Sequence, residues 1–103
     1  MASVRWTVGA RRDLQGIVRF IAADSPTYAA ATAERIVSAA ETLRRHPRMG
    51  RMVPEYQDPQ IRELVVSSYR VVYRLRHDQV TVVAIVHGSR NLGPSMDAKW
   101  NLN

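Results

Sequence analysis

The spacing of apolar residues changes twice along the 103-residue chain. Apolar and polar positions alternate from Val4 to Val8, which predicts a short strand. From Ala10 onward the apolar residues recur as on one face of a helix, at Leu14, Ile17, Val18 and Ile21. We expect this first helix to end near residues 22–25, because Pro26 disfavours a helical conformation at the residue before it.

A second, longer helix is expected to begin at Ser25 and Pro26. Serine is a favoured N-cap, and proline is favoured at the first helical position. The apolar stripe that follows is rich in small residues: Ala29, Ala33, Ile36, Ala40 and Leu43. Basic residues 44–46 are expected in the last turn, where cations suit the helix dipole, and Pro47 ends the helix. The short link between the two helices predicts an antiparallel helical hairpin.

Residues 47–60 hold three prolines and one glycine, which predicts a surface loop. Strand-like runs follow at 61–66, 69–76 and 80–87, with tight connections between them. The predicted fold class is α+β: an N-terminal strand, an antiparallel helical hairpin and a three-stranded antiparallel meander. We expect the helices on one face of an antiparallel sheet and the other face free. Residues 1–103 are expected to form one domain, with no element assigned to 93–103.

The hairpin between residues 69 and 87 sets which side chains share a face. With a two-residue turn at 77–78, an apolar set faces the helices: Leu75 with Val80, Tyr73 with Val82, and Val71 with Ala84. The opposite face then pairs Arg74 with Thr81, Val72 with Val83, and Arg70 with Ile85. His87 would lie diagonal to Arg70, roughly 7–8 Å away between backbones. This assignment of side chains to the two faces depends on the register of the hairpin, since a slip of one residue moves every side chain of one strand to the opposite face.

Basic side chains therefore gather on the face that the core does not need: Arg70, Arg74, Arg76 and His87, with Arg90 just beyond the strand end. Guanidinium groups beside a titratable imidazole can hold a phosphate and move a proton. A charged strand face that only keeps the sheet soluble explains the same pattern. Arg62 is a further candidate contact with a target, and a surface ion pair with Glu63 is its alternative explanation.

The overall charge points to an anionic partner. Fifteen Lys and Arg residues against nine Asp and Glu residues give a net charge of +6, and fourteen of the fifteen are arginine. Arginine suits phosphate and carboxylate, although a GC-rich genome also enriches it without a functional cause. A basic domain of this size is expected to bind nucleic acid or an acidic protein.

Several classes of protein are excluded by composition. The chain has no cysteine, which removes disulfides, thiolate nucleophiles and cysteine-bound zinc. Its three histidines lack metal-ligand spacing, so we expect neither a metal site nor a cofactor. The longest apolar run, residues 80–86, is too short to span a bilayer, and residues 1–10 lack the apolar region of a signal peptide. We therefore expect a cytoplasmic protein without a membrane partner.

Five segments together resemble the RelE/ParE superfamily of toxins from type II toxin–antitoxin systems, over about residues 4–92. They read WTVGARRDLQGIVRFIAADSP, LRRHPRMGRMVPE, IREL, YRVVYRL and VHGSR. The resemblance implies the fold derived above and a cytoplasmic toxin that inhibits growth and contributes to plasmid stabilisation. It also implies a small acidic cognate antitoxin, bound in a toxin–antitoxin hetero-oligomer.

The superfamily divides by activity. RelE-like members cut mRNA in the ribosomal A site without a metal, whereas ParE-like members poison DNA gyrase and need not be enzymes. If the chain is a ribonuclease, the resemblance makes Arg70, His87 and Arg90 the catalytic candidates, with the arginines on the phosphate and His87 transferring a proton.

Two departures weaken the ribonuclease reading. Glu63 stands where RelE-like nucleases have lysines on the preceding strand, and Met96 stands near the position of their tyrosine. The segments GRMVPE, REL and HGSR look more like the ParE side. We therefore favour a ParE-like toxin acting on gyrase. The alternatives are a ribosome-dependent endoribonuclease and a non-toxic basic binding module.

Overall fold

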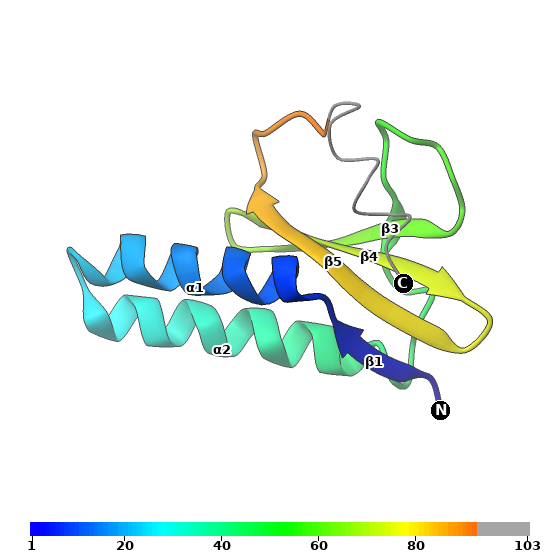
Figure 1. Cartoon of the computed structure of the whole chain (residues 1–103), viewed down its shortest axis with the longest axis horizontal. Helices are drawn as coiled ribbons and strands as arrows, with labels where there is room; N and C mark the ends of the chain where they lie inside the picture. The colour runs from blue at the N-terminus through cyan, green and yellow to red at the C-terminus, as the bar shows by residue number, and fades with distance from the viewer. Residues whose placement is uncertain (93–103) are drawn as a thin grey trace.

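The computed structural model describes residues 1–92, and Met96 and the rest of 93–103 lie outside this part. The described chain runs through β1 (Ser3–Trp6), α1 (Val8–Ala22), α2 (Pro26–Thr42), β2 (Arg51–Met52), β3 (Ile61–Val66), β4 (Tyr69–Arg76) and β5 (Gln79–His87) (Figure 1). This order confirms the α+β class, with the N-terminal strand, the two helices and the three-stranded meander in the predicted places.

Both helices begin at side-chain caps. The Thr7 hydroxyl accepts a hydrogen bond from Ala10 N at 3.0 Å. The Ser25 hydroxyl accepts one from Tyr28 N at 3.1 Å, which confirms the predicted start of the second helix. The predicted end of α2 is wrong, because the helix ends at Thr42 and residues 44–46 follow it rather than forming its last turn. From Leu43 to Arg45, each backbone N–H donates to the carbonyl three residues before it, which is a tighter turn than that of an α-helix. No helix within residues 1–92 combines the length and apolar character needed to cross a bilayer.

The strands form one mixed sheet in the order β1-β5-β4-β3-β2. β1 is parallel to β5, whereas the other neighbouring strands are antiparallel. The parallel pair is possible because the helical hairpin and the first strands of the meander lie between β1 and β5 in the sequence. The expectation of a purely antiparallel sheet is therefore wrong at this one edge. The predicted loop at 47–60 also contains a short strand, since β2 pairs with Glu63 and Arg62 of β3.

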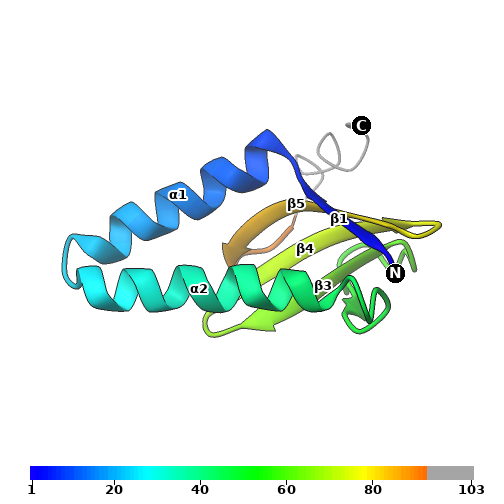
Figure 2. The same cartoon turned by 90° about the horizontal axis from the view of Figure 1, so that it is seen from below.

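The helices cover one face of the sheet, as predicted (Figure 2). α2 contributes the buried side chains of Ile36 and Ala40, and Leu43 follows at its C-cap. They pack with the sheet residues Val71, Tyr73, Leu75, Val80, Val82 and Ile85.

The opposite face, which we call the distal face, is not free, and that prediction is wrong. A second apolar core lies there, formed by Val53, Ile61, Val72, Val83, Ala84, Val86 and Leu92, with Tyr56 packed against it. β4 and β5 are apolar on both faces, so each face needs a cover. The chain from residue 53 to residue 61 supplies that cover on the distal side.

The register between β4 and β5 shifts by one residue between Val72 and Tyr73. The predicted pairs hold near the turn, from Leu75 to Tyr73, and fail beyond it. Past the shift, Val72 pairs with Ala84, Val71 with Ile85, Arg70 with Val86, and Tyr69 with His87. A β-bulge of this kind places one extra residue on one strand and reverses the side-chain alternation beyond it.

Candidate functional site

Arg70 lies buried in the distal face, where two carboxylates neutralise its charge. Its Nε donates to Glu63 Oε1 at 2.5 Å, and its two terminal nitrogens donate to both Glu55 oxygens at 2.7 and 2.8 Å. Arg51, from β2, donates to the second Glu63 oxygen at 2.7 Å. We call these four residues the Arg70 cluster. Only 5% of Arg70 is exposed, so its guanidinium is held by protein rather than presented to a phosphate.

The cluster also ties two segments to the sheet. Arg70 Nη1 donates to the Arg90 carbonyl at 3.0 Å, and Leu92 N donates to Glu55 Oε2 at 3.1 Å. The hydrogen bond from Arg70 lowers the pKa of Glu55 to about 2, and the same bond raises the pKa of Arg70. Both groups thus stay charged, and they hold the loop around Glu55 and the chain at 90–92 against the distal face.

His87 lies on the helix-facing side of the sheet, and the prediction that it shares a surface with Arg70 is wrong. It pairs with Tyr69, whose ring packs on the helix-side core, whereas Arg70 pairs with Val86 of the distal core. The His87 and Tyr69 rings meet edge to face with centroids 5.8 Å apart. Nδ1 of His87 lies 2.8 Å from the Ser89 hydroxyl. The register shift is the cause, since it turns the end of β5 over relative to Arg70.

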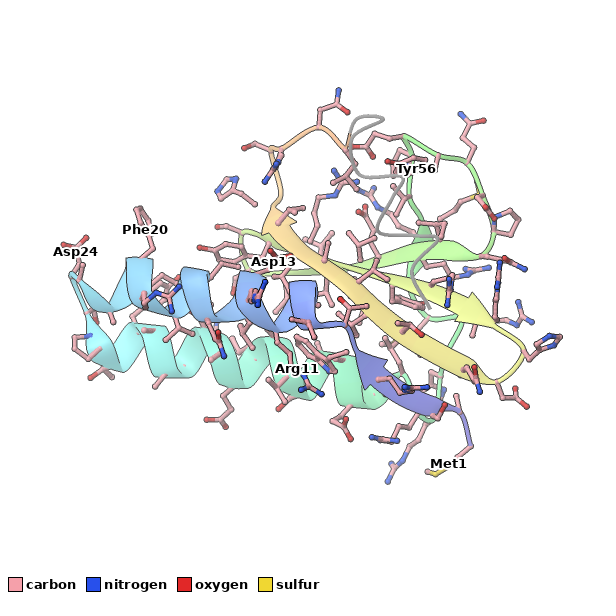
Figure 3. All side chains as sticks on the ribbon, viewed as in Figure 1. Met1, Arg11, Asp13, Phe20, Asp24 and Tyr56 are labelled. Carbon is pink, nitrogen blue, oxygen red and sulfur yellow. The ribbon has the colours of Figure 1, made fainter. Side chains whose placement is uncertain are left out.

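A surface groove of about 440 Å³ lies between α1 and the end of β5, and it brings together two of the predicted residues, His87 and Arg90. Its other lining residues are Arg12, Asp13, Gly16, Ile17, Phe20, Tyr69, Ile85 and Val86. Asp13 Oδ2 accepts a hydrogen bond from Ile85 N at 3.0 Å, which ties α1 to the edge of β5 (Figure 3). Its lining combines apolar side chains with the basic groups of Arg12, His87 and Arg90, so the groove can bind an apolar segment that carries negative charge.

Arg62 lies apart from both the Arg70 cluster and the groove, on the helix-facing side of the sheet opposite Tyr73. Its guanidinium donates to the carbonyl oxygens of Pro59 and Gly50, each at 2.9 Å. Arg62 thereby holds the loop that leads into β3. The alternative of a surface pair with its neighbour Glu63 is wrong, because Glu63 points to the distal face.

Arg74 and Arg76 lie on the distal face, as predicted, near the turn between β4 and β5. Arg74 is half-buried opposite Thr81, and Arg76 is exposed. Burial lowers the pKa of Arg74, and the nearby charge of Arg76 lowers it further. The two guanidinium groups are therefore close enough to influence one another.

The sequence reasoning missed the partners of Arg70. Strand alternation places Glu63 on the same face as Arg70, a signal that was available once the β3–β4 pairing was assumed. Glu55 sits in an irregular loop, where no periodicity predicts its position. Within residues 1–92 no group of three or more histidines and carboxylates is placed to hold a metal ion.

Comparisons with known proteins agree on one family. A family model described as ParE toxin of type II toxin-antitoxin system, parDE, matches residues 4–92. Toxin RelE2 of Caulobacter vibrioides is 36% identical over 91 residues, which are 87% of this chain and 99% of that protein.

Two solved structures share the fold. The chromosomal ParDE system from P. aeruginosa has a TM-score of 0.69 at 22% identity, covering 84% of this chain and 96% of that one. The toxin-antitoxin complex RelBE2 from Mycobacterium tuberculosis has a TM-score of 0.58 at 27% identity, with the same two coverages of 84% and 96%. The arrangement of strand, helical hairpin and meander is thus common to these chains.

Proposed function

The chain belongs to the ParE toxin family of type II toxin–antitoxin systems, and we propose that it inhibits growth by poisoning DNA gyrase without being an enzyme. The observation that carries this proposal is the neutralised state of Arg70. Glu55 and Glu63 occupy the hydrogen-bonding directions that a ribonuclease would need for a scissile phosphate.

The placement of His87 supports the same proposal. A general acid or base must come within hydrogen-bond reach of the proton it transfers, about 2.6–3.2 Å between heavy atoms. His87 and Arg70 lie on opposite faces of the sheet, so they cannot act on one phosphate together. A toxin that acts by binding needs no such constellation, and exposed apolar and basic side chains suffice for it.

We further propose that a small acidic cognate antitoxin neutralises the toxin in a hetero-oligomer in the cytoplasm. The net charge of +6 favours a partner of opposite sign, because complementary charge speeds association and rejects other cationic proteins. The groove beside His87 and Arg90 offers such a partner both apolar contacts and cations.

A supercoiling assay with purified gyrase and relaxed plasmid tests the proposal. The toxin should abolish supercoiling and cause cleaved DNA to accumulate, and prior mixing with the antitoxin should restore supercoiling. Unchanged supercoiling at saturating, soluble toxin would contradict gyrase as the target. Normal growth of a host that expresses the soluble toxin without antitoxin would instead favour a non-toxic binding module.

The second candidate is a ribosome-dependent endoribonuclease. It is favoured by the 36% identity to Toxin RelE2 and by the meeting of His87 and Arg90 in one groove. Mapping of mRNA ends on translating ribosomes distinguishes the two candidates, and we expect no toxin-dependent ends. If ends do appear and His87→Ala lowers their rate of formation about 10²–10⁴-fold, the ribonuclease reading replaces ours.

A further inference from the structure

A cluster of basic and polar side chains lies on the distal face next to the β4–β5 turn, away from the Arg70 cluster. Arg5 of β1 and Arg74 of β4 both stand opposite Thr81 of β5, so the three share one row across neighbouring strands. In the next row toward the turn, Ser3 and Arg76 both stand opposite Gln79. We call these six residues the turn-end patch.

Alternation along the strands sets the face of this patch. Val4, Trp6, Leu75, Val80 and Val82 all pack in the helix-side core. The residues between them therefore project to the distal side. Figure 1 shows β1, β5 and β4 lying side by side in this region. The patch is thus a continuous surface built on three paired strands rather than on a loop.

Two of the three guanidinium groups of the patch, those of Arg5 and Arg76, have no carboxylate partner within residues 1–92, unlike Arg70. Arg5 and Arg76 are exposed, and within residues 1–92 neither forms an ion pair with a carboxylate. Asp78, in the adjoining turn, accepts a backbone hydrogen bond from Ser3 N through its carbonyl. Burial lowers the pKa of Arg74, and the charge of neighbouring Arg76 lowers it further. Among the described residues, one end of the distal face is therefore charge-balanced, and the other carries the guanidinium groups of Arg5 and Arg76 without a carboxylate partner.

The geometry suits a regular line of negative charges. Arg5 and Arg74 are two strand spacings apart, about 10 Å between backbones, and Arg76 is about 7 Å along the strand from Arg74. Side chains of this length can reach several successive phosphates of a nucleic-acid backbone. Thr81, Gln79 and Ser3 between them add neutral hydrogen-bond donors, of the kind that contact phosphate oxygens.

The patch favours a duplex over a single strand. Single-stranded nucleic acid is bound largely by stacking its bases on aromatic side chains. No strand position of the patch is aromatic, and Trp6, Tyr69 and Tyr73 all pack on the helix-facing side. Arginine and hydroxyl contacts to phosphate suffice for a duplex and carry no sequence information.

We propose that the turn-end patch binds the phosphate backbone of double-stranded DNA, independently of sequence. This deepens the proposed function and rests on it for the source of the duplex, because a toxin that acts on gyrase meets the DNA that gyrase holds. Binding by the patch would add affinity for the gyrase–DNA complex over free gyrase.

Fluorescence anisotropy with a labelled duplex of arbitrary sequence, in the absence of gyrase, tests the patch directly. The variant Arg5→Gln/Arg76→Gln leaves half-buried Arg74 in place, so the sheet should stay folded. At about 100 mM salt we expect its affinity for the duplex to fall about 10- to 100-fold. The slope of log K against log salt should become shallower by about 1.8, because two phosphate contacts are lost.

The matched control is Arg11→Gln/Arg19→Gln, which removes the same two charges from exposed positions on α1. It should bind the duplex within about twofold of the unmodified chain, since distant exposed charges are screened. Equal losses in both variants would overturn the proposal, because binding would then follow net charge alone. Tighter binding of single-stranded DNA or RNA than of duplex would overturn it too.

Two further outcomes separate this inference from its premise. If the patch variant binds the duplex normally but loses the antitoxin, the patch is a protein-binding surface and the proposal fails. If the unmodified chain leaves gyrase unaffected yet binds the duplex through the patch, the patch assignment stands and only the gyrase proposal fails. Circular dichroism of each variant confirms that a loss of binding is not a loss of fold.

Discussion

Arg70 and Glu63 are diagonal neighbours across the β3–β4 pair on the distal face, joined by a hydrogen bond of 2.5 Å. Their side chains are 6% and 0% exposed. Removing two such charges from water is costly, and only their mutual attraction and additional hydrogen bonds offset that cost. Glu55 and Arg51 supply the additional bonds. The pair is therefore a structural element of the fold, and its loss should be seen first in stability.

Replacing Arg70 with leucine should lower the free energy of unfolding by about 3–5 kcal/mol, because Glu63 would remain buried with the exposed Arg51 as its one remaining cation among residues 1–92. Urea denaturation followed by circular dichroism measures this loss. The double variant Arg70→Leu/Glu63→Leu should recover part of it, since both buried charges are then removed together.

Arg51→Leu is the control for that change. Its side chain is 62% exposed, so the loss of its bond to Glu63 should cost less than about 1 kcal/mol. If Arg70→Leu were as stable as the unmodified chain, Arg70 would be free to act in binding or catalysis, contrary to our account of the cluster.

The lowered pKa of Glu55 gives stability a defined pH dependence. The folded chain holds this carboxyl at a pKa of about 2, below its ordinary value of 4.5. Its contribution is thus complete above about pH 4.5 and disappears as the pH falls toward 2. Glu55→Gln should lower the free energy of unfolding by about 1–3 kcal/mol at pH 7, and this difference should shrink through that window.

Glu34→Gln serves as the control, because Glu34 is exposed on α2 and forms no ion pair within residues 1–92. Its stability should follow the unmodified chain at every pH. A difference between Glu55→Gln and the unmodified chain that stays constant from pH 7 to pH 2 would contradict the ion pair with Arg70.

Gly50 and Gly16 should respond to alanine in opposite ways. A Cβ at Gly50 would lie 2.6 Å from the Tyr73 hydroxyl and 2.7 Å from the Glu63 carbonyl, where the backbone cannot move aside easily. It would also disturb the hydrogen bond that Gly50 N donates to Tyr73 Oη at 3.0 Å. Gly50→Ala should therefore destabilise the fold by about 1–3 kcal/mol.

A Cβ at Gly16, inside α1, would meet nothing within 4 Å. Gly16→Ala should stabilise the chain by about 0.5–1 kcal/mol, because alanine loses less backbone entropy in a helix. Thermal unfolding of the two variants beside the unmodified chain measures both effects. A Gly50→Ala variant of unchanged melting temperature would show that the loop at 47–52 does not pack on Tyr73 as described.

The sequence by itself determined the features that depend on neighbouring residues. Ser25 and Pro26 begin α2 where predicted, because capping and a fixed φ act within one turn. The bounds of β3 and β4 follow from their apolar runs and tight turns. The sequence also predicted correctly that Arg74 lies on the distal face. Only two residues separate Arg74 from the turn, so it lies before the register shift.

Only the tertiary structure decided the site. No pattern in the sequence predicts the β-bulge that places one extra residue in β5. This bulge puts His87 on the opposite face of the sheet from Arg70. Glu55 reaches Arg70 from a loop fifteen positions away, and the cover of the distal face comes from the same loop. Strand register and charge pairing depend on contacts between segments that are far apart in the sequence. These contacts form only when the whole chain folds, so local sequence patterns do not predict them. Local patterns therefore set the elements, whereas long-range packing set which charges are neutralised and which remain available for binding.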